Sequence, residues 1–273
     1  MLKYLFKNIL VKLSICILLI FNISCNNSNP KTTKIISKDG MVFINGGKFE
    51  MGGDNDEARQ DEYPKHVVTI SSFWMDESEV TNAEFKNFVD ETGYITTAER
   101  KIDWEEIKKV LPPNTPKPHD SLLSPASLVF KETSTSNLND YSKWWSLIRN
   151  ANWRQPFGPG SNIDDKENYP VIHISWEDAN EYCKWSGKRL PTEAEFEYAS
   201  RGGKVNNIYS WGNEKVDIGQ LKANIWEGEF PTKNNINDKF YYASPIKSFK
   251  PNNYGIYDIA GNVWEWCSDW YHS

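Results

Sequence analysis

Short apolar runs bounded by glycine, asparagine and charged residues open the folded part of the chain. The run at 41–44 is apolar throughout, whereas those at 48–51 and 66–70 mix apolar with polar residues; the first two flank the stretch Asn45-Gly46-Gly47. Apolar runs of four or five residues with such boundaries are typical of β-strands, and a Gly-rich stretch between two of them is typical of a turn. The pattern predicts two short strands around a turn, followed by a third strand.

Three helices are predicted by capping boxes, in which a Ser or Thr side chain and an acid three residues later satisfy the free amides of a helix start. The boxes are Thr81 with Glu84, Ser175 with Asp178, and Thr192 with Glu195. Apolar residues follow each box at helical spacing, and Gly93 and Gly187 are expected to end the first two helices. The second box is expected to be the weakest because its acid is Asp.

Between about residues 96 and 165 the spacing of apolar residues no longer predicts helices or strands. Five prolines at 112–125 break any helix there, and the expected anchors are Trp144, Trp145 and Trp153. A loop of this length inside a compact domain is usually functional or an insertion. From residue 201 onward Gly, Asn and Pro recur among aromatic residues, which indicates irregular structure. The chain is therefore predicted to be an α+β protein with little regular secondary structure.

The first segment has the pattern of an export signal. Lys3, Lys7 and Lys12 precede an unbroken apolar run at 15–21. This run is too short to span a membrane comfortably and fits a cleaved signal peptide. We interpret residues 1–24 as a signal peptide of the lipoprotein type.

Cys25 follows the apolar run directly after Asn-Ile-Ser, which resembles a bacterial lipobox with Asn where Leu is usual. In this interpretation Cys25 is lipidated, residues 25–40 are a polar tether, and 41–273 form the domain. The protein would then be exported and held on a membrane, in the periplasm or at the cell surface. Ordinary secretion, with Cys25 left in the discarded peptide, is the alternative.

Net charge and cysteine content argue against two classes of function, nucleic-acid binding and zinc binding. The formal net charge is −6, and it becomes −9 without a leader that carries three lysines and no acid. A chain with this net negative charge lacks the excess of basic residues that nucleic-acid binding requires. Twelve Trp residues suit a core with little regular structure. With Cys16 in the leader and Cys25 at its end, Cys183 and Cys267 remain in the domain, with no Cys or His ladder for zinc and only scattered histidines.

Several blocks along the chain carry a family resemblance. The most diagnostic is the run GKRLPTEAEFEYA at 187–199. Further blocks lie at 43–52, 62–64, 73–76, 79–82, 151–156, 169–176, 223–231 and 261–266. Because so many blocks follow one another in order, the chain resembles the formylglycine-generating enzyme, or sulfatase-modifying factor, family from Met41 to Trp270.

The resemblance implies a fold and a chemistry. The fold would be a loop-rich variant of the C-type-lectin-like fold. Known enzymes of the family are copper-dependent oxidases that use O₂ to convert a Cys within a Cys-x-Pro-x-Arg segment of unfolded sulfatases into formylglycine. Copper(I) is held there by two thiolates near the C-terminus, which are the soft ligands that this ion favours.

The given chain departs from that pattern at its end. It stops at Ser273, before the Arg-x-Gly-Gly-Ser-like block and the paired cysteines. No catalytic residue is therefore predicted within it, and the stretch as given is expected to be inactive, with copper expected only in a full-length form. Cys183 matches a family cysteine that tends to form a disulfide with a missing partner; a buried thiol on its helix is the alternative. Cys267 has no counterpart in the pattern.

The resemblance also implies two structural calcium sites. Ca²⁺ takes six to eight oxygens from carboxylates, amides and main-chain carbonyls. The first would use Asn224 and Asp238 with the carbonyls of Ile225 and Phe240, and the second Asp258 and Glu265 with the carbonyls of Gly261 and Val263. Asp258 stands where Asn is expected. The alternative is that these are turn residues with solvated acids.

Two functions remain open. The first is a formylglycine-generating oxidase with an unfolded sulfatase as its partner. The second is a non-catalytic structural or binding lipoprotein of the same fold, of the gliding-motility type. Trp264 and Trp266 would border a substrate cleft under the first, although alternating Trp residues more often belong to a core. His173, among apolar neighbours, is expected to be a hydrogen-bonded core histidine. A sulfoxide synthase is discounted because residues 25–41 leave no room for its helical iron-binding domain.

Overall fold

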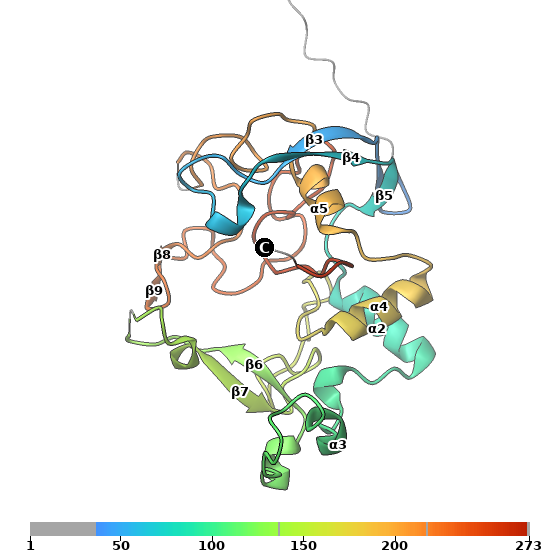
Figure 1. Cartoon of the computed structure of the whole chain (residues 1–273), viewed down its shortest axis with the longest axis vertical. Helices are drawn as coiled ribbons and strands as arrows, with labels where there is room; N and C mark the ends of the chain where they lie inside the picture. The colour runs from blue at the N-terminus through green and yellow to red at the C-terminus, as the bar shows by residue number, and fades with distance from the viewer. Residues whose placement is uncertain (1–36, 136, 217, 272–273) are drawn as a thin grey trace, which may run out of the picture. The chain divides into compact units, whose positions relative to one another are not determined.

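The computed structural model describes residues 37–271 except 136 and 217. The predicted signal peptide, the lipidation site Cys25 and most of the tether lie outside the described residues. Within them the fold is α+β with short elements, as predicted, and no helix is both long and apolar enough to cross a membrane. Figure 1 shows the small sheets and α5 at the top, α2 and α4 beside each other in the middle, and a separate hairpin below them.

Two small antiparallel sheets form from the first strands. One sheet has the order β1-β2-β5, and the other pairs β3 with β4. The bounds are β1 (Ser37–Lys38), β2 (Met41–Ile44), β3 (Gly47–Met51), β4 (His66–Ile70) and β5 (Phe73–Asp76). Met41 pairs with Asp76 in the first sheet, and Gly47 pairs with Ile70 in the second. The three predicted strands are confirmed.

The strands on either side of Asn45-Gly46 form, but they do not pair with each other. A Cβ on Gly46 would lie 2.4 Å from the Ile70 carbonyl oxygen and 2.6 Å from the Ser72 nitrogen. The Gly46 amide also donates to Ser72 Oγ at 2.9 Å. Glycine is therefore needed because the chain crosses closely over the β4–β5 connection, and this crossing sends β2 and β3 into different sheets.

The three predicted helices form with the predicted caps. They are α2 (Asn82–Thr92), α4 (Trp176–Ser186) and α5 (Glu193–Ser200), and a complete capping box precedes each one. Gly93 and Gly187 end the first two in the left-handed conformation, with φ of 68° and 70°. The other helical elements are short. They are α3 (Trp104–Ile107) and the 3₁₀ turns η1 (Gln60–Glu62), η2 (Thr97–Glu99), η3 (Asp120–Leu123) and η4 (Tyr141–Lys143).

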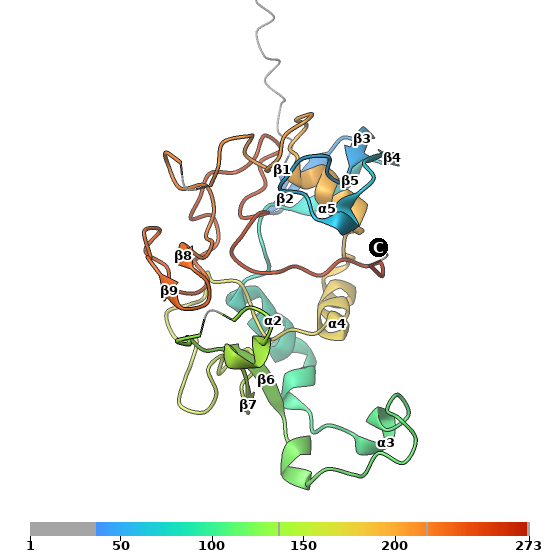
Figure 2. The same cartoon turned by 60° about the vertical axis from the view of Figure 1, so that its left-hand side comes forward.

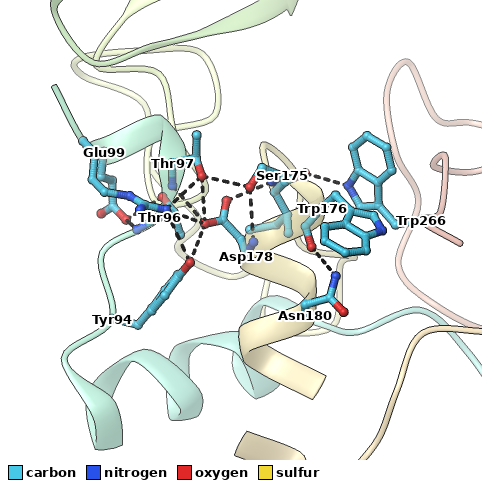
Figure 3. A network of polar contacts seen from close by, with 11 residues as sticks. Tyr94, Thr96, Thr97, Glu99, Ser175, Trp176, Asp178, Asn180 and Trp266 are labelled. Atoms are coloured by element: carbon cyan, nitrogen blue, oxygen red, sulfur yellow. Dashed lines mark hydrogen bonds and ion pairs between the residues drawn. The ribbon is translucent and has the colours of Figure 1, made fainter. Parts of the chain in front are cut away.

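Asp178, the acid of the α4 capping box, does more than cap its helix. It is fully buried, and its Oδ2 accepts the amide of Ser175 at 2.9 Å. Its Oδ1 accepts the Tyr94 hydroxyl and the Thr97 amide, both at 2.9 Å, and lies 3.5 Å from the Arg100 guanidinium. Figure 3 shows the resulting network, which ties the segment after α2 to the start of α4. We expected this cap to be weak because we considered only the bonds within the capping box, and the bonds to Tyr94 and Thr97 come from another segment.

Two hydrophobic clusters form the core. The first joins β2, α5 and a late loop and contains Val42, Ile44, Ala199, Ile256 and Ile259. The second joins α2 and α4 around a single buried Trp and contains Phe85, Phe88, Val89, Trp153 and Tyr182. The aromatic rings of the second cluster meet mainly edge to face, with centroids 5.3 to 5.9 Å apart. Large rings thus replace regular secondary structure as the filling of the core.

The segment that we predicted to be irregular contains a β-hairpin. Strands β6 (Ala126–Phe130) and β7 (Trp145–Arg149) pair antiparallel, with Leu128 opposite Leu147. Figures 1 and 2 show this hairpin apart from the other sheets. The prediction failed because a long polar loop separates the strands, so no short turn marks the hairpin. Of the expected anchors, Trp144 and Trp153 are buried and Trp145 is half exposed.

The chain after α5 is irregular, as predicted. The structure describes a single pair of two-residue strands there, β8 (Gly228–Glu229) and β9 (Lys233–Asn234). Side-chain bonds from Asn, Asp and Ser residues hold these loops in place of a sheet. Asn252, for example, accepts the amides of Tyr254 and Ile256 and donates to the Ala199 carbonyl oxygen at the end of α5.

Candidate functional site

An open cleft of about 1770 Å³ lies beside the β6–β7 hairpin. One part of its lining consists of aromatic rings from this hairpin and from the segment 226–242. Phe130 meets Trp226 with ring centroids 5.3 Å apart, and Trp144 meets Phe230 at 5.6 Å. These rings pack edge to face, which is the favoured geometry for aromatic pairs. The hairpin and the segment 226–242 together form an aromatic wall of the cleft.

Trp264 and Trp266 provide another part of the cleft lining. Trp264 is 99% exposed and Trp266 is half exposed, so the core interpretation of these residues is wrong and the cleft interpretation fits. Two indole bonds fix the backbone of this stretch. Trp266 Nε1 donates to the Ile174 carbonyl oxygen, and Trp176 Nε1 donates to that of Cys267, both at 2.9 Å. Figure 3 shows the two indoles next to each other at the start of α4.

Acidic groups also line the cleft. Both Asp76 carboxylate oxygens accept bonds from Lys188 Nζ, at 2.7 and 2.9 Å. Among the described residues, the charges that act on Glu265 are acids. Glu265 is exposed to the cleft, and partial desolvation raises its pKa, with a further rise from the charges of Glu79, Asp258 and Asp76. Several carboxylates thus repel one another at this end of the cleft.

The first candidate calcium cluster contains a buried acid with a free oxygen. Asp238 Oδ1 accepts the amide of Phe240 at 2.9 Å, whereas its Oδ2 is buried without a partner among the described residues. Burial raises the pKa of Asp238, and the charge of Glu227 adds to the rise. Asn224 uses both amide protons, on the Tyr242 carbonyl oxygen and on Asn262 Oδ1, which leaves its amide oxygen available. An unpaired buried carboxylate oxygen is costly, and a cation would remove that cost.

The second candidate cluster has the same feature. Asp258 Oδ2 accepts the amide of Lys247 at 2.5 Å, and Asp258 Oδ1 is buried without a partner in the part of the chain that is described. Burial raises the pKa of this carboxyl group. Gly261 has φ of 93°, and a Cβ there would lie 2.5 Å from the Asn224 carbonyl oxygen. Only glycine fits so close an approach between the two clusters.

Glu79 joins this cluster, and the sequence interpretation did not include it. Its Oε1 accepts Asn262 Nδ2 at 2.9 Å, and its Oε2 is buried without a partner within residues 37–271 as described. Burial raises the pKa of Glu79 to about 7, and the charge of Asp258 adds to the rise. Its place directly before the α2 capping box hid this role, because acids near a helix start are common for local reasons.

A cation at either cluster would need main-chain oxygens. Among the described residues no three Cys, His, Asp or Glu side chains converge closely enough to hold a metal ion. Calcium differs from zinc in accepting carbonyl oxygens as a large share of its ligands. The residues present therefore fit calcium through a mixed set of oxygens and do not fit a zinc site.

The two cysteines outside the leader are free thiols. Cys183 is half-buried on α4, and burial raises its pKa, with a smaller contribution from Asp76. Burial, together with Asp269, Glu193 and Glu265, raises the pKa of Cys267 to about 12. Copper(I) and disulfide exchange both require the thiolate form. The raised pKa of each group favours the thiol over the thiolate, and the predicted disulfide of Cys183 stays untested.

A family model described as a sulfatase-modifying factor enzyme 1-like domain matches residues 26–273. The chain belongs to the sulfatase-modifying factor family. It is 44% identical over 239 residues to the formylglycine-generating enzyme of Mus musculus, covering 85% of this chain and 58% of that protein. The corresponding enzyme of Thermomonospora curvata is 43% identical over 235 residues, covering 85% of this chain and 72% of that one. The chain thus spans little more than half the length of the mouse relative.

Some members of the sulfatase-modifying factor family are described as inactive. A bovine protein named inactive C-alpha-formylglycine-generating enzyme 2 is 39% identical over 241 residues, covering 85% of this chain and 71% of that protein. Among solved structures, PvdO from Pseudomonas aeruginosa has a TM-score of 0.51 and 22% identity, covering 89% of this chain and 76% of that chain. This last similarity concerns the fold alone.

Proposed function

We propose that this chain is the sulfatase-modifying factor domain of a formylglycine-generating oxidase. When full length, the protein would oxidise the active-site cysteine of an unfolded sulfatase to formylglycine. The observation that carries the proposal is the open cleft with its aromatic wall and its exposed Trp264. An extended, unfolded polypeptide needs a long open surface rather than an enclosed pocket, and aromatic faces bind it at low cost in side-chain entropy.

Copper belongs to this proposal only for the full-length protein. A pair of thiolates is the ligand set that copper(I) favours. Cys183 and Cys267 do not match the paired C-terminal cysteines that the family resemblance implies, so no copper is assigned to them. We therefore assign the residues described here to substrate binding and to support of the cleft, and no oxidation step to them.

The test uses the full-length protein and a synthetic peptide with a Cys-x-Pro-x-Arg segment. We expect the peptide to bind, and its cysteine to become an aldehyde that a hydrazide reagent captures and mass spectrometry detects. Trp264→Ala should weaken binding by about 2 kcal/mol, or roughly 30-fold, if this ring is a hot spot of the cleft. Trp270→Ala is the matched control, because Trp270 is 88% exposed in the same segment but does not line the cleft.

The second candidate is a non-catalytic structural or binding lipoprotein of the same fold. The bovine relative that is named inactive, at 39% identity, supports this second candidate. The same experiment separates the two functions, because a binding module would hold the peptide without forming an aldehyde. Failure of the peptide to bind at all, with Trp264→Ala equal to Trp270→Ala, would remove the peptide cleft from both proposals.

Structural calcium is also part of the proposed function. The support is the pair of buried carboxylates, Asp238 and Asp258, that each keep one oxygen without a partner among the described residues. Calcium should raise the melting temperature of protein that has been treated with a chelator, whereas magnesium should do so weakly, since it demands a strict octahedron and keeps its water. An unchanged melting temperature with calcium would contradict the assignment.

The export signal, the membrane anchor at Cys25 and the C-type-lectin-like variant of the fold remain proposals as well. The loop-rich structure with few short strands agrees with the last of these. Labelled palmitate should enter the wild-type protein in bacteria and should not enter Cys25→Ser. Incorporation that survives this substitution would place the lipid elsewhere.

A further inference from the structure

Asn262 lies between the two candidate calcium clusters and is bonded to both. It stands between Gly261 and Val263, whose carbonyl oxygens are assigned to the second cluster. Its main-chain amide donates to the Asn224 carbonyl oxygen at 2.8 Å. Its side-chain oxygen accepts from Asn224 Nδ2 at 3.1 Å. Asn224 is a ligand residue of the first cluster, so two bonds connect ligand-bearing segments of the two clusters directly.

The Asn262 side chain is held from several further directions. Its Oδ1 accepts the amide of the fully buried Ser244 at 2.8 Å, and its Nδ2 donates to Glu79 Oε1 at 2.9 Å. The backbone of Asn262 has a left-handed φ of 56°, a conformation that Asn tolerates better than most residues. Four segments that are far apart in the sequence therefore meet at a single amide group.

This arrangement makes the geometry of each cluster depend on the other. The bonds to Tyr242 and Asn262 set the rotation of the Asn224 amide, and with it the direction of the oxygen offered to the first cation. The main-chain bond from the Asn262 amide to the Asn224 carbonyl oxygen holds the backbone at Asn262, and with it the carbonyl oxygens of Gly261 and Val263 on either side. A cation at one cluster orders a backbone that the other cluster also needs, so the second cation meets a lower ordering cost.

Repulsion between the two cations acts in the opposite sense. Each cluster, however, supplies its own carboxylates, Asp238 in the first and Asp258 with Glu265 in the second. The unpartnered buried oxygens of Asp238 and Asp258 face the cation that enters and offset its charge. The shared ordering of the loops then decides the sign of the coupling.

We propose that Asn262 couples the two calcium sites, so that calcium at one site raises the affinity of the other. This inference rests on the proposed calcium sites. Coupling between sites is reciprocal, because the same free energy must appear whichever site is filled first. Removal of either site should therefore weaken the remaining one by the same factor.

Calorimetric titration of the chelator-treated protein with CaCl₂ tests the proposal. Wild type should bind two ions with positive cooperativity. Asp238→Asn keeps the acceptor for the Phe240 amide and removes the charge of the first site, and it should weaken the second site by at least about fivefold. Glu265→Ala should weaken the first site by the same factor. The exposed Asp90→Asn is the matched control and should leave both affinities unchanged.

Asn262→Ala removes the side-chain bonds and keeps the main-chain bond to Asn224, so it should keep two sites and lower the cooperativity. Adding Asp238→Asn to it should then weaken the second site by a smaller factor than in the wild-type background. The two single-site variants carry the test by themselves if Asn262→Ala does not fold. Two ions that bind independently in all these proteins would overturn the coupling and leave the calcium sites intact. A wild-type protein that binds no calcium would overturn the sites and the coupling together.

Discussion

Replacement of the buried Asp178 should cost more stability than replacement of any exposed acid of the domain. Asp178→Ala removes the acceptor of Ser175, Tyr94 and Thr97, and Figure 3 shows that these groups surround the carboxylate and would be left facing one another. A buried charge network that loses one member typically loses about 3 to 5 kcal/mol of unfolding free energy, because the remaining polar groups stay desolvated.

The expected shift in melting temperature follows from the size of the domain. For 150 to 250 residues, 1 kcal/mol corresponds to roughly 2 to 4 °C, so a loss of about 3 to 5 kcal/mol should lower the melting temperature of Asp178→Ala by about 6 to 20 °C. Asp178→Asn keeps the shape and one acceptor oxygen, but its amide protons would face donors. It should fall between wild type and alanine. Thermal unfolding followed by near-ultraviolet circular dichroism measures both variants.

Two further proteins make the test specific to the network. Asp90→Ala removes an exposed acid paired with Lys86 on α2 and should change stability by less than about 0.5 kcal/mol. Tyr94→Phe removes one bond to Asp178, and its effect should largely vanish in the Asp178→Ala background because the two residues share one network. An Asp178→Ala protein that melts within 2 °C of the wild type, by the scale of roughly 2 to 4 °C per kcal/mol, would refute the reasoning.

Three other predictions concern the cleft and its supports. Burial lowers the pKa of His173 below 6.5 in the folded protein, so the free energy of unfolding should fall as the pH drops from 6.5 toward that lowered pKa. In His173→Gln, urea titrations should show a weaker loss of stability over this pH range. Gly261→Ala should cost at least about 2 kcal/mol more than Gly160→Ala, because both have φ near 93° but only the first Cβ would strike the backbone; equal melting temperatures would contradict this. Trp176→Phe should speed hydrogen exchange of residues 263–271, whereas Trp185→Phe, which loses a bond to a surface acid, should leave it unchanged.

Local signals in the sequence were sufficient for the helices but not for the sheets. Each capping box involves residues three apart, so Thr81 with Glu84 could be identified without knowing any tertiary contact. The pairing of β2 with β5 depends on the close approach at Gly46, which joins residues about 25 positions apart. The β6–β7 hairpin was missed for the same reason, since no short turn connects its strands.

The candidate site could be predicted only in part. Family resemblance indicated both calcium clusters, and the structure leaves an unpartnered buried oxygen in each, on Asp238 and Asp258. The family resemblance could not indicate Glu79, because Glu79 is linked to the second cluster through Asn262, which lies far along the chain. Composition showed that Trp residues are abundant but not which of them are exposed, because exposure of Trp264 depends on how the whole segment is held.

The first hydrophobic cluster also sets an order for folding. Val42 and Ile44 in β2 pack against Ile256 and Ile259, about 200 residues later in the chain. The second cluster closes much earlier, because it needs nothing beyond Tyr182. Closing the longer loop is slower and costs more chain entropy. During synthesis the α2–α4 half can therefore acquire protease resistance first, while the N-terminal strands stay available to chaperones until residue 259 has emerged.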